Sequence, residues 1–433
     1  MHKFDIAIIG GGILGTAVSY WLSSLYDMKL CVIEKEQHVA AHASSRNTGV
    51  VHSPFYLDPQ KKREIARAAL ISHDLWRDFA VQKSLPWKQC GTIEVALDDS
   101  QHKSLEKYLK WGRQNGIPDS ELELMDSRDV AKKEPNIKCT SGLYCSRDVS
   151  TDYGIMTGEL HKMSENYGTK FLFGHSVAGI SEAGTVMLDD GSSVECSFLI
   201  NCAGGHSLGI AKKMGLGRDY SALHFRGEYW VAEQKYADLV NTNVYSVAKF
   251  ANFPFLDPHW IKKANGQTEI GPNAVPVADP ETYSGYVGSI SGALAKLREV
   301  LGGNSRKLLL NPEFLALVSK EWKSSLSKNA MVNRVKQFIP SVKPSFFVKK
   351  GTAGIRSPIV TDRGEFLSDI LQLKTQNSLH VINYNSPGAT GAPAYAALLV
   401  RGLHDAGILK EPTKAKSTIW NFDRVTEQMS NQN

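Results

Sequence analysis

The chain has 433 residues, of which 42% are hydrophobic and 22% are charged. This composition excludes an intrinsically disordered protein, and the length allows one large core or two domains. The net charge of +6 comes from scattered lysines and arginines rather than from a basic stripe, so we expect no nucleic-acid partner. The six cysteines form neither a CxxC pair nor a zinc-ligand spacing, which predicts a reducing compartment and no metal site.

The first predicted elements are a strand, a turn and a helix. FDIAIIG (4–10) has the apolar, β-branched character of a parallel strand buried on both faces. ILGTAVSYWLSSL (13–25) has helical spacing, and KLCVIEKE (29–36) predicts a second strand, which completes a βαβ unit. The apolar run 6–22 is long enough to span a bilayer, but its consecutive glycines favour a strand–turn–helix. Because few residues precede the run, we expect no signal peptide and a cytoplasmic protein.

The middle of the chain predicts alternating helices and antiparallel strands. Asn311 before Pro312 is a predicted helix cap. From about Lys410 the polar tail is expected to be partly loose. The expected elements, in chain order, are a helix at 59–79, a strand at 91–99, two helices within 101–135, a β-meander at 169–205, strands within 224–290, a helix at 310–326, a strand at 379–385 and a helix after the turn 386–393.

A GxGxxG motif joins the first strand to the first helix. Gly10 permits the tight turn, Gly12 lets the backbone approach a pyrophosphate, and Gly15 allows close packing of helix on strand. The free N–H groups at the helix start attract phosphate. Glu34 ends the second strand, where it is placed to accept hydrogen bonds from ribose hydroxyls. The alternatives are a glycine-rich turn without a ligand and a surface charge at Glu34. The predicted dinucleotide site also includes Ile13, Leu14 and Lys35.

After these two strands the chain leaves the regular βα pattern, which favours FAD over a nicotinamide cofactor. We expect a mixed α/β (α+β) fold. In it, a Rossmann-like FAD-binding domain alternates with an antiparallel-sheet substrate domain that carries helices. The expected FAD-binding domain comprises residues 1–80, 146–215 and 346–433, and the expected substrate-binding domain comprises residues 81–145 and 216–345.

Several motifs follow one another along nearly the whole chain: GGGILG, IEKE, a serine-rich loop, NCAGG and a late glycine-rich turn. In this order they resemble the FAD-dependent D-amino-acid-oxidase-like superfamily. Five segments are similar to one branch of it, the L-2-hydroxyglutarate dehydrogenase (oxidase) family. They are SSRNTGVVH (44–52), CGTIEVAL (90–97), HFRGEYW (224–230), IGPNAVP (270–276) and AGIR (353–356).

Two positions depart from that family. Arg46 stands where the family usually has histidine, and SPGATGAP (386–393) looks more like the late turn of malate:quinone oxidoreductases. Arg46 could face the flavin phosphate, the substrate or a nearby acid. Both families oxidise an L-2-hydroxy dicarboxylic acid to its 2-oxo acid, so the resemblance implies this reaction. L-2-hydroxyglutarate is the expected substrate and L-malate the alternative. An amino-acid or amine oxidase and a non-catalytic flavoprotein are further alternatives.

Three side chains are candidates for the implied reaction. Histidine ordinarily titrates near neutral pH, and the resemblance places the His52 loop against the flavin, so His52 is the expected base. The alternative for His52 is a packing role. Arg356 and Arg226 are candidate clamps for carboxylates, because a guanidinium binds a carboxylate through two hydrogen bonds. The alternative for each arginine is an internal salt bridge. His206 and His224 are lesser candidates.

The resemblance also implies where the chain contacts FAD. The early loop is expected along the flavin, the meander and NCAGG at the adenine end, and the late turn at the flavin's pyrimidine edge, unless that turn only caps a helix. Some members of this superfamily attach FAD through a cysteine near the C-terminal end, and no cysteine follows Cys202 here. The resemblance therefore implies non-covalent FAD, with a histidyl linkage as the alternative. The implied contacts are Ser44, Ser45, Asn47, Thr48, Gly49, Val50, Val177, Ala203, Gly204, Gly388, Ala389 and Thr390.

One segment is a candidate for contact with an electron acceptor. VKQFIPSVKPSFFVKK (335–350) mixes phenylalanine with lysine. This mixture predicts peripheral contact with the inner face of a membrane and electron delivery to quinone. The alternative interpretation is an exposed helix end and loop with ordinary lysines, in which case another acceptor takes the electrons.

Overall fold

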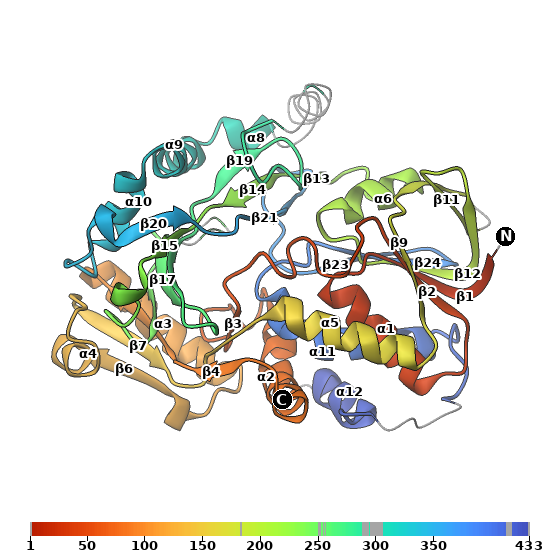
Figure 1. Cartoon of the computed structure of the whole chain (residues 1–433), viewed down its shortest axis with the longest axis horizontal. Coiled ribbons are helices and arrows are strands. Elements are labelled where there is room, and N and C mark those ends of the chain that lie inside the picture. Colours follow the sequence, from red (N-terminus) through yellow and green to blue (C-terminus); the bar gives the residue numbers. More distant parts are fainter. Residues whose placement is uncertain are drawn as a thin grey trace.

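The computed structural model describes residues 2–181, 184–249, 257–287, 306–412 and 418–431, together with Phe253, Phe255 and Leu294. Within these residues, two large β-sheets lie side by side, each covered by helices (Figure 1). We call the sheet that contains the N-terminal strand the first sheet and the other the second sheet. This mixed α/β architecture confirms the expected fold class.

The first sheet has β1 (His2–Ile9) at its centre, with β12 (Ser193–Asn201) and β2 (Leu30–Glu34) parallel to it on either side. Ile6 and Ile8 join the core on one face of the sheet, whereas Ala7 and Ile9 join the core on the other. Both faces are therefore buried, as expected for a central parallel strand. The other strands are β9 (Lys170–Phe173), β10 (Val177–Ile180), β11 (Thr185–Leu188), β23 (Leu371–Lys374) and β24 (Ser378–Ile382).

The expected β-meander at 169–205 is only partly antiparallel. β10, β11 and β12 pair antiparallel, but β9 pairs in parallel with β2 at the edge of the sheet. β24 pairs in parallel with β12, so a strand from the C-terminal part of the chain lies in the same sheet. The apolar residues of β9 and β12 therefore belong to strands with parallel partners. The alternation of apolar residues in the sequence does not reveal this parallel pairing.

Helices cover the first sheet. α1 (Ile13–Leu25) packs between α5 (Tyr153–Asn166) and α11 (Gly388–Asp405), and α11 also packs on α2 (Arg63–Lys83) (Figure 1). The strand–turn–helix expected for the apolar run 6–22 is therefore confirmed. Among the described residues, no helix is both long and apolar enough to cross a membrane.

The last part of the polar tail, which was expected to be only partly loose, is ordered. Trp420 is 2% exposed, and its ring lies 5.7 Å from that of Trp21 and 5.8 Å from that of Trp76. α12 (Phe422–Ser430) follows and packs on α11 and α2. One tryptophan and one face of a short amphipathic helix bury enough apolar surface to order a segment that is otherwise polar.

The second sheet has the strand order β20-β15-β18-β17-β16-β5-β7-β6 and is antiparallel except for the pair β5–β16. α3 (Asp99–Gln114) and α4 (Ser127–Lys133) confirm the two helices expected within 101–135. α9 (Pro312–Leu326) is capped by Asn311, as expected, and α10 (Lys328–Val335) follows. The strands are β5 (Thr92–Ala96), β6 (Leu122–Asp126), β7 (Ser141–Cys145), β15 (Trp230–Ala232), β16 (Asn243–Ser246), β17 (His259–Lys262), β18 (Thr268–Gly271) and β20 (Phe347–Lys350).

The segment 335–350 does not present its phenylalanines to solvent. Phe338 and Phe347 are each 1% exposed in the core of the second sheet, and Phe346 stacks on Tyr236 with ring centroids 3.7 Å apart. A membrane-surface segment needs exposed apolar side chains. Phe338 and Phe347 therefore serve the core of the second sheet, whereas Val348 of the same segment is 58% exposed.

Shorter strands form smaller sheets beside the two large ones. β14 (His224–Gly227) pairs with β21 (Gly354–Arg356), and β20 pairs with β15. Residues 347–356 therefore join strands from the expected substrate-binding part, although we expected them in the FAD-binding part. The remaining elements are β3 (Val50–Val51), β4 (Trp87–Gln89), β8 (Val149–Thr151), α6 (Ser207–Lys213), β13 (Ser221–Ala222), β19 (Val275–Val277), α8 (Arg306–Leu309) and β22 (Ile359–Val360).

Candidate active site

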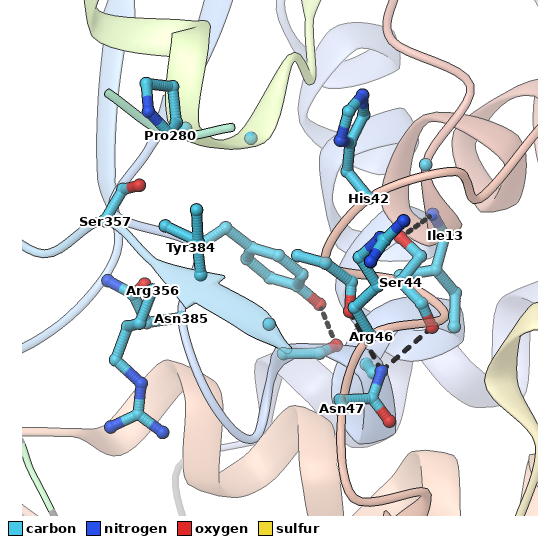
Figure 2. Close-up of a pocket in the computed structure, with 18 of the residues that line it drawn as sticks. Ile13, His42, Ser44, Arg46, Asn47, Pro280, Arg356, Ser357, Tyr384 and Asn385 are labelled. Carbon is cyan, nitrogen blue, oxygen red and sulfur yellow. Dashed lines mark hydrogen bonds between the residues drawn. The ribbon is translucent and has the colours of Figure 1, made fainter. Parts of the chain in front are cut away.

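A cavity of about 560 Å³ extends from the β1–α1 turn to strands β16, β17 and β21. This volume is in the range of cofactor and small-molecule sites. In Figure 2, His42, Ser44, Arg46 and Asn47 stand on one side of the cavity, with Arg356, Ser357 and Asn385 on the other. We call the part near the turn the cofactor end and the part near Arg356 the substrate end.

The β1–α1 turn has the geometry of a phosphate cradle. Gly10 has a φ of +103°, and a Cβ there would lie 2.6 Å from the carbonyl oxygen of Cys202. A Cβ at Gly15 would lie 2.0 Å from the carbonyl oxygen of Gly10. Gly10 and Gly12 line the cavity, whereas Gly15 lies behind the turn and lets α1 approach the strand. The start of α1 therefore meets the cavity through a turn that has no Cβ atom at Gly10 or Gly12.

Glu34 lies at the end of β2 and is 7% exposed. Its Oε2 accepts a hydrogen bond of 2.7 Å from the Gly11 nitrogen, and its Oε1 accepts one of 2.9 Å from the Glu36 nitrogen. These bonds fix the carboxylate in the cavity wall beside the glycine turn. Its remaining lone pairs are available to ribose hydroxyls. Glu34 is therefore a buried structural carboxylate rather than a surface charge.

The early loop meets the cavity through some of its expected contacts and not others. Ser44 Oγ accepts a hydrogen bond of 2.9 Å from the Ile13 nitrogen at the start of α1 (Figure 2). Asn47 Oδ1 accepts one of 2.8 Å from the Gly49 nitrogen, which shapes the turn. Ser45 is exposed, and a Cβ at Gly49 would lie 2.3 Å from the Thr151 carbonyl oxygen. The expected loop residues that line the cavity are Ser44, Asn47, Thr48 and Val50.

The late turn is itself the first turn of α11, which begins at Gly388. Thr390 Oγ1 lies 2.8 Å from the Tyr153 hydroxyl and 3.2 Å from the His52 nitrogen, so this helix start is tied to the early loop. Residues 388–390 line the cavity, so the positive end of the helix dipole lies there. The late-turn and adenine-end residues that line the cavity are Gly388, Ala389, Thr390, Val177, Ala203 and Gly204.

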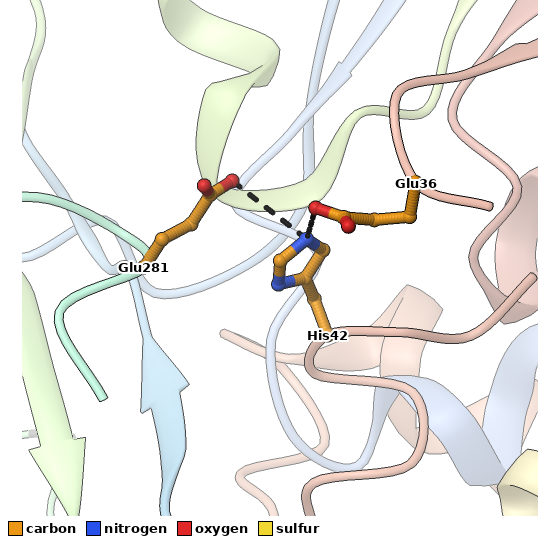
Figure 3. A group of neighbouring side chains, drawn as sticks. All are labelled: Glu36, His42 and Glu281. Atoms are coloured by element: carbon orange, nitrogen blue, oxygen red, sulfur yellow. Dashed lines mark hydrogen bonds and ion pairs between the residues drawn. The ribbon is translucent and has the colours of Figure 1, made fainter. Parts of the chain in front are cut away.

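An ionic cluster lies at the rim of the cofactor end. His42 Nε2 is 2.9 Å from Glu36 Oε1 and 3.8 Å from Glu281 Oε1 (Figure 3). Lys35 Nζ bridges the same two carboxylates at 2.8 and 2.5 Å, and His206 Nε2 is 2.6 Å from Glu281. The hydrogen bonds from His206 and Lys35 lower the pKa of Glu281 to about 2. The ligand atoms of Glu36, His42 and Glu281 are close enough together to hold a metal ion. The Lys35 ammonium already neutralises this group.

Arg46 belongs to the same rim. Its guanidinium lies 4.1 Å from the ring centroid of Tyr283, and its Nε donates a hydrogen bond of 3.0 Å to the Ala41 carbonyl oxygen. The Tyr283 hydroxyl lies 2.7 Å from His42 Nδ1. Arg46 therefore stacks on the segment that carries Glu281 while it lines the cavity.

His52 lies beside a buried carboxylate. Its Nδ1 is 3.3 Å from Oδ2 of Asp148, which is 0% exposed. Asp148 also accepts hydrogen bonds of 2.7 Å from the Ser53 nitrogen and 2.8 Å from Thr92 Oγ1. Burial raises the pKa of Asp148, but hydrogen bonding and the charge of His52 outweigh it and hold this pKa below its usual range. Because an ionised carboxylate only accepts, His52 Nδ1 carries the hydrogen and Nε2 is the basic nitrogen.

The two candidate arginines have different surroundings. Arg356 on β21 lines the substrate end, where burial lowers the pKa of its guanidinium against the opposing effect of Tyr229. Arg226 is 3% exposed and lies 3.1 Å from Glu228 Oε1, and it donates a 3.1 Å hydrogen bond to the Thr282 carbonyl. Arg226 is outside the set of described residues that line the cavity. The structure places Arg226 in an internal salt bridge, which is the alternative interpretation of this residue, and gives no support to its expected role as a clamp.

Sequence reasoning missed Tyr245 and His259, which line the substrate end, and Asp148, which lies next to His52. Asp148 follows a short turn without a motif, and its link to His52 arises only when β3 pairs with β8. Tyr245 and His259 sit in strands of unremarkable composition and line the cavity. The lesser candidate His224 is 5% exposed, with Nδ1 2.8 Å from Ser357 Oγ.

The chain is similar to known proteins in sequence and in fold. The family described as FAD dependent oxidoreductase (DAO) matches residues 5–401. The L-2-hydroxyglutarate dehydrogenase of Escherichia coli (strain K12) is 28% identical over 401 residues, which cover 92% of each chain. The mitochondrial L-2-hydroxyglutarate dehydrogenase of Caenorhabditis elegans is 30% identical over 412 residues, with 92% of this chain and 93% of its own covered. FAD-bound L-alpha-glycerophosphate oxidase from Mycoplasma pneumoniae has the same fold, with a TM-score of 0.74, 19% identity, and coverage of 96% and 97%.

The residues at the cofactor end fit FAD. Two helix starts, a glycine turn in which a Cβ would clash, and a buried carboxylate at the end of β2 surround one continuous cavity. The expected cofactor and the expected superfamily are both confirmed, and the protein is an oxidoreductase. The chain belongs to the DAO family of FAD-dependent oxidoreductases.

Proposed function

We propose that the chain oxidises L-2-hydroxyglutarate to 2-oxoglutarate. The observation that carries this proposal is the His52–Asp148 pair, which shares one cavity with Arg356 and the FAD-binding turn. Oxidation of a hydroxy acid requires a base for the hydroxyl proton and a cation for the carboxylate. The names of the bacterial and nematode relatives support L-2-hydroxyglutarate as the substrate.

His52 takes the hydroxyl proton at Nε2. Asp148 holds the opposite nitrogen at 3.3 Å, which fixes the ring and stabilises the imidazolium that forms. FAD, when bound, supplies the acceptor for the hydride that leaves the α-carbon. The edges of Tyr56 and Tyr245, whose ring centroids lie 5.9 and 5.8 Å from that of His52, limit its motion. The proton and the hydride therefore leave the substrate toward different groups.

Arg356 holds the carboxylate next to the reacting carbon. It is deep enough for burial to lower the pKa of its guanidinium, and a less hydrated cation binds a carboxylate more strongly. Tyr229, which is 6% exposed, closes the wall beside it. The low exposure of this end excludes bulk water from the reacting groups.

A second candidate substrate is L-malate, which the turn 386–393 favours by its resemblance to malate:quinone oxidoreductases. For the electrons we propose a quinone or another small acceptor. The burial of Phe338 and Phe347 removes segment 335–350 as support for a membrane route to quinone.

The direct test is anaerobic bleaching of the visible flavin absorbance in the purified holoenzyme. L-2-Hydroxyglutarate should bleach it fastest, L-malate more slowly, and D-2-hydroxyglutarate and amino acids not at all. Product should appear as 2-oxoglutarate in an amount equal to the flavin. Bleaching by amino acids alone would overturn the proposal, and a faster response to L-malate would replace the substrate while keeping the reaction class.

A further inference from the structure

Tyr245 and His259 form a pair on the cavity face of the second sheet. β16 and β17 run antiparallel with Val244 opposite Trp260, a register that sets Tyr245 opposite His259 with both side chains on one face. Their rings stack with centroids 4.0 Å apart and 22° between planes. Both residues line the cavity, and the Tyr245 ring lies 5.8 Å from that of His52. Sheet register therefore brings this pair to the proposed substrate.

Each member of the pair has a buried polar atom without a partner. Tyr245 is 7% and His259 2% exposed. Within the described part of the chain, neither the Tyr245 hydroxyl nor His259 Nε2 makes a hydrogen bond. A buried polar group without a partner costs about 1–3 kcal/mol, so native proteins rarely retain one. Of the buried atoms without a partner among the described residues, these two belong to stacked rings that line the cavity, and this placement points to a ligand that satisfies both.

The hydrogen-bonding roles of the two atoms follow from their surroundings. His259 Nδ1 is 3.0 Å from the Asp257 carbonyl oxygen, which can only accept, so Nδ1 carries the hydrogen and Nε2 is an acceptor. Burial lowers the pKa of His259 to about 3, so the free imidazole is neutral. Burial also raises the pKa of Tyr245 well above its usual range, so its hydroxyl keeps its hydrogen. The pair therefore presents one donor and one acceptor.

An ionised dicarboxylate alone cannot satisfy this pair. The α-hydroxyl is the single donor of L-2-hydroxyglutarate, and in the proposed function its proton goes to His52. A carboxyl group that arrives with a proton satisfies both atoms. One oxygen accepts from Tyr245, and the proton lies between the other oxygen and His259 Nε2.

Charges around His259 favour the arrival of a carboxylate. The titratable groups that shift the pKa of His259 are His52, Arg356 and Asp257, and Asp148 acts on Tyr245. Asp257 is already neutralised by Lys320 at 2.7 Å and by Arg334. The two cationic or basic neighbours disfavour protonation of His259 until a negative ligand balances them.

We propose that Tyr245 and His259 are the subsite for the distal carboxyl group of the dicarboxylate, which binds together with one proton from solvent. Arg356 holds the other carboxylate. This inference rests on the proposed function and names the residues that distinguish a dicarboxylate from a monocarboxylate. The proton goes to the shared position between the carboxyl oxygen and His259 Nε2, and no other bond changes.

The test is calorimetric binding to the FAD-loaded enzyme, without turnover. The ligands are 2-oxoglutarate and 2-oxobutyrate, which lacks the distal carboxyl group, each in two buffers of different ionisation enthalpy. The unmodified enzyme should take up about one more proton with 2-oxoglutarate than with 2-oxobutyrate. Tyr245→Phe and His259→Gln should weaken 2-oxoglutarate binding by about 10- to 100-fold, because each removes one buried hydrogen bond. Binding of 2-oxobutyrate should change by less than about 3-fold.

Loss of the extra proton uptake in His259→Gln, with bound FAD retained, would confirm the subsite. His404→Gln is the matched control, because His404 lies in the last turn of α11. Equal weakening of both ligands, or unchanged 2-oxoglutarate binding and proton uptake in both variants, would overturn the inference. If no 2-hydroxy acid bleaches the flavin while the variants still lose 2-oxoglutarate selectively, the proposed reaction fails and the carboxyl subsite stands.

Discussion

The two ends of the cavity are built by different means. At the cofactor end, the main chain faces the cavity, through the glycine turn after β1 and the starts of α1 and α11. At the substrate end, side chains from β16, β17 and β21 and from the loop after β3 converge. A main-chain cradle requires glycine at fixed spacing, whereas a side-chain site requires strands in register. The main-chain cradle therefore tolerates no added atom, whereas the side-chain site tolerates a substitution at the cost of one interaction.

The largest effect is expected at the cofactor end. Gly15→Ala places a Cβ 2.0 Å from the Gly10 carbonyl oxygen, so α1 must move away from β1 and the cradle is lost. We expect almost complete loss of bound FAD, measured as the ratio of flavin to protein absorbance after purification. Gly158→Ala in α5 is the control, because a Cβ there meets nothing within 4 Å. It should keep FAD and gain up to about 1 kcal/mol of helix stability. FAD retention in Gly15→Ala would contradict the cradle.

The next effect is expected at His52. His52→Gln should keep FAD but slow anaerobic flavin bleaching by about 100-fold or more, because it removes the proposed base. Stopped-flow absorbance with saturating L-2-hydroxyglutarate measures the rate. An unchanged rate with FAD bound would remove His52 as the base and leave it as a packing residue.

A smaller effect is expected at Asp148, the carboxylate next to His52. Asp148→Asn keeps the shape but removes the charge that stabilises the His52 imidazolium, so bleaching should slow by about 10- to 100-fold. Because the loss acts through His52, the double variant should be no slower than His52→Gln alone. Additive losses in the double variant would show that Asp148 acts independently of His52.

The smallest effect concerns stability. Glu94 lies beside Tyr245 in the β5–β16 pair and is 6% exposed. Burial and the charge of Asp148 raise its pKa to about 8. Between the usual pKa of glutamate and pH 8, the folded state holds a proton that the unfolded state releases, so stability falls as pH rises, by at most about 1.4 kcal/mol per pH unit. Glu94→Gln should remove this slope in urea unfolding between pH 5 and pH 8. Equal slopes would mean that Glu94 is ionised in the folded state.

The cofactor end was largely predictable from sequence, and the substrate end was not. GxGxxG, Glu34 and the late turn at Gly388 each combine residue type and spacing with one local conformation, so their placement follows from the chain itself. Ser45 and Gly49 were expected to contact FAD, but they do not line the cavity. The composition of a loop does not say which of its residues turn away from the cavity. A local sequence pattern therefore predicts where a main-chain site lies, but it does not predict which residues line that site.

Side-chain partners depend on contacts between distant segments. Asp148 approaches His52 only through the pairing of β3 with β8, and Tyr245 meets His259 only through strand register. Arg226 differs from these residues, since its ion-pair partner Glu228 lies only two residues away along the chain. The proposed roles of His52 and Arg356 stay predictions until the kinetic variants are measured.

The arrangement of the first sheet has a consequence for synthesis of the protein. β1 pairs with β12, which pairs with β24, and the cofactor cradle needs the start of α11 at Gly388. At translation rates of about 5–20 residues per second, the start of α11 leaves the ribosome roughly 20 to 80 s after β1. During that interval β1 carries two apolar faces without their final cover. The nascent chain must therefore be kept from aggregating before it can bind FAD, and cofactor capture belongs to the last stage of its folding.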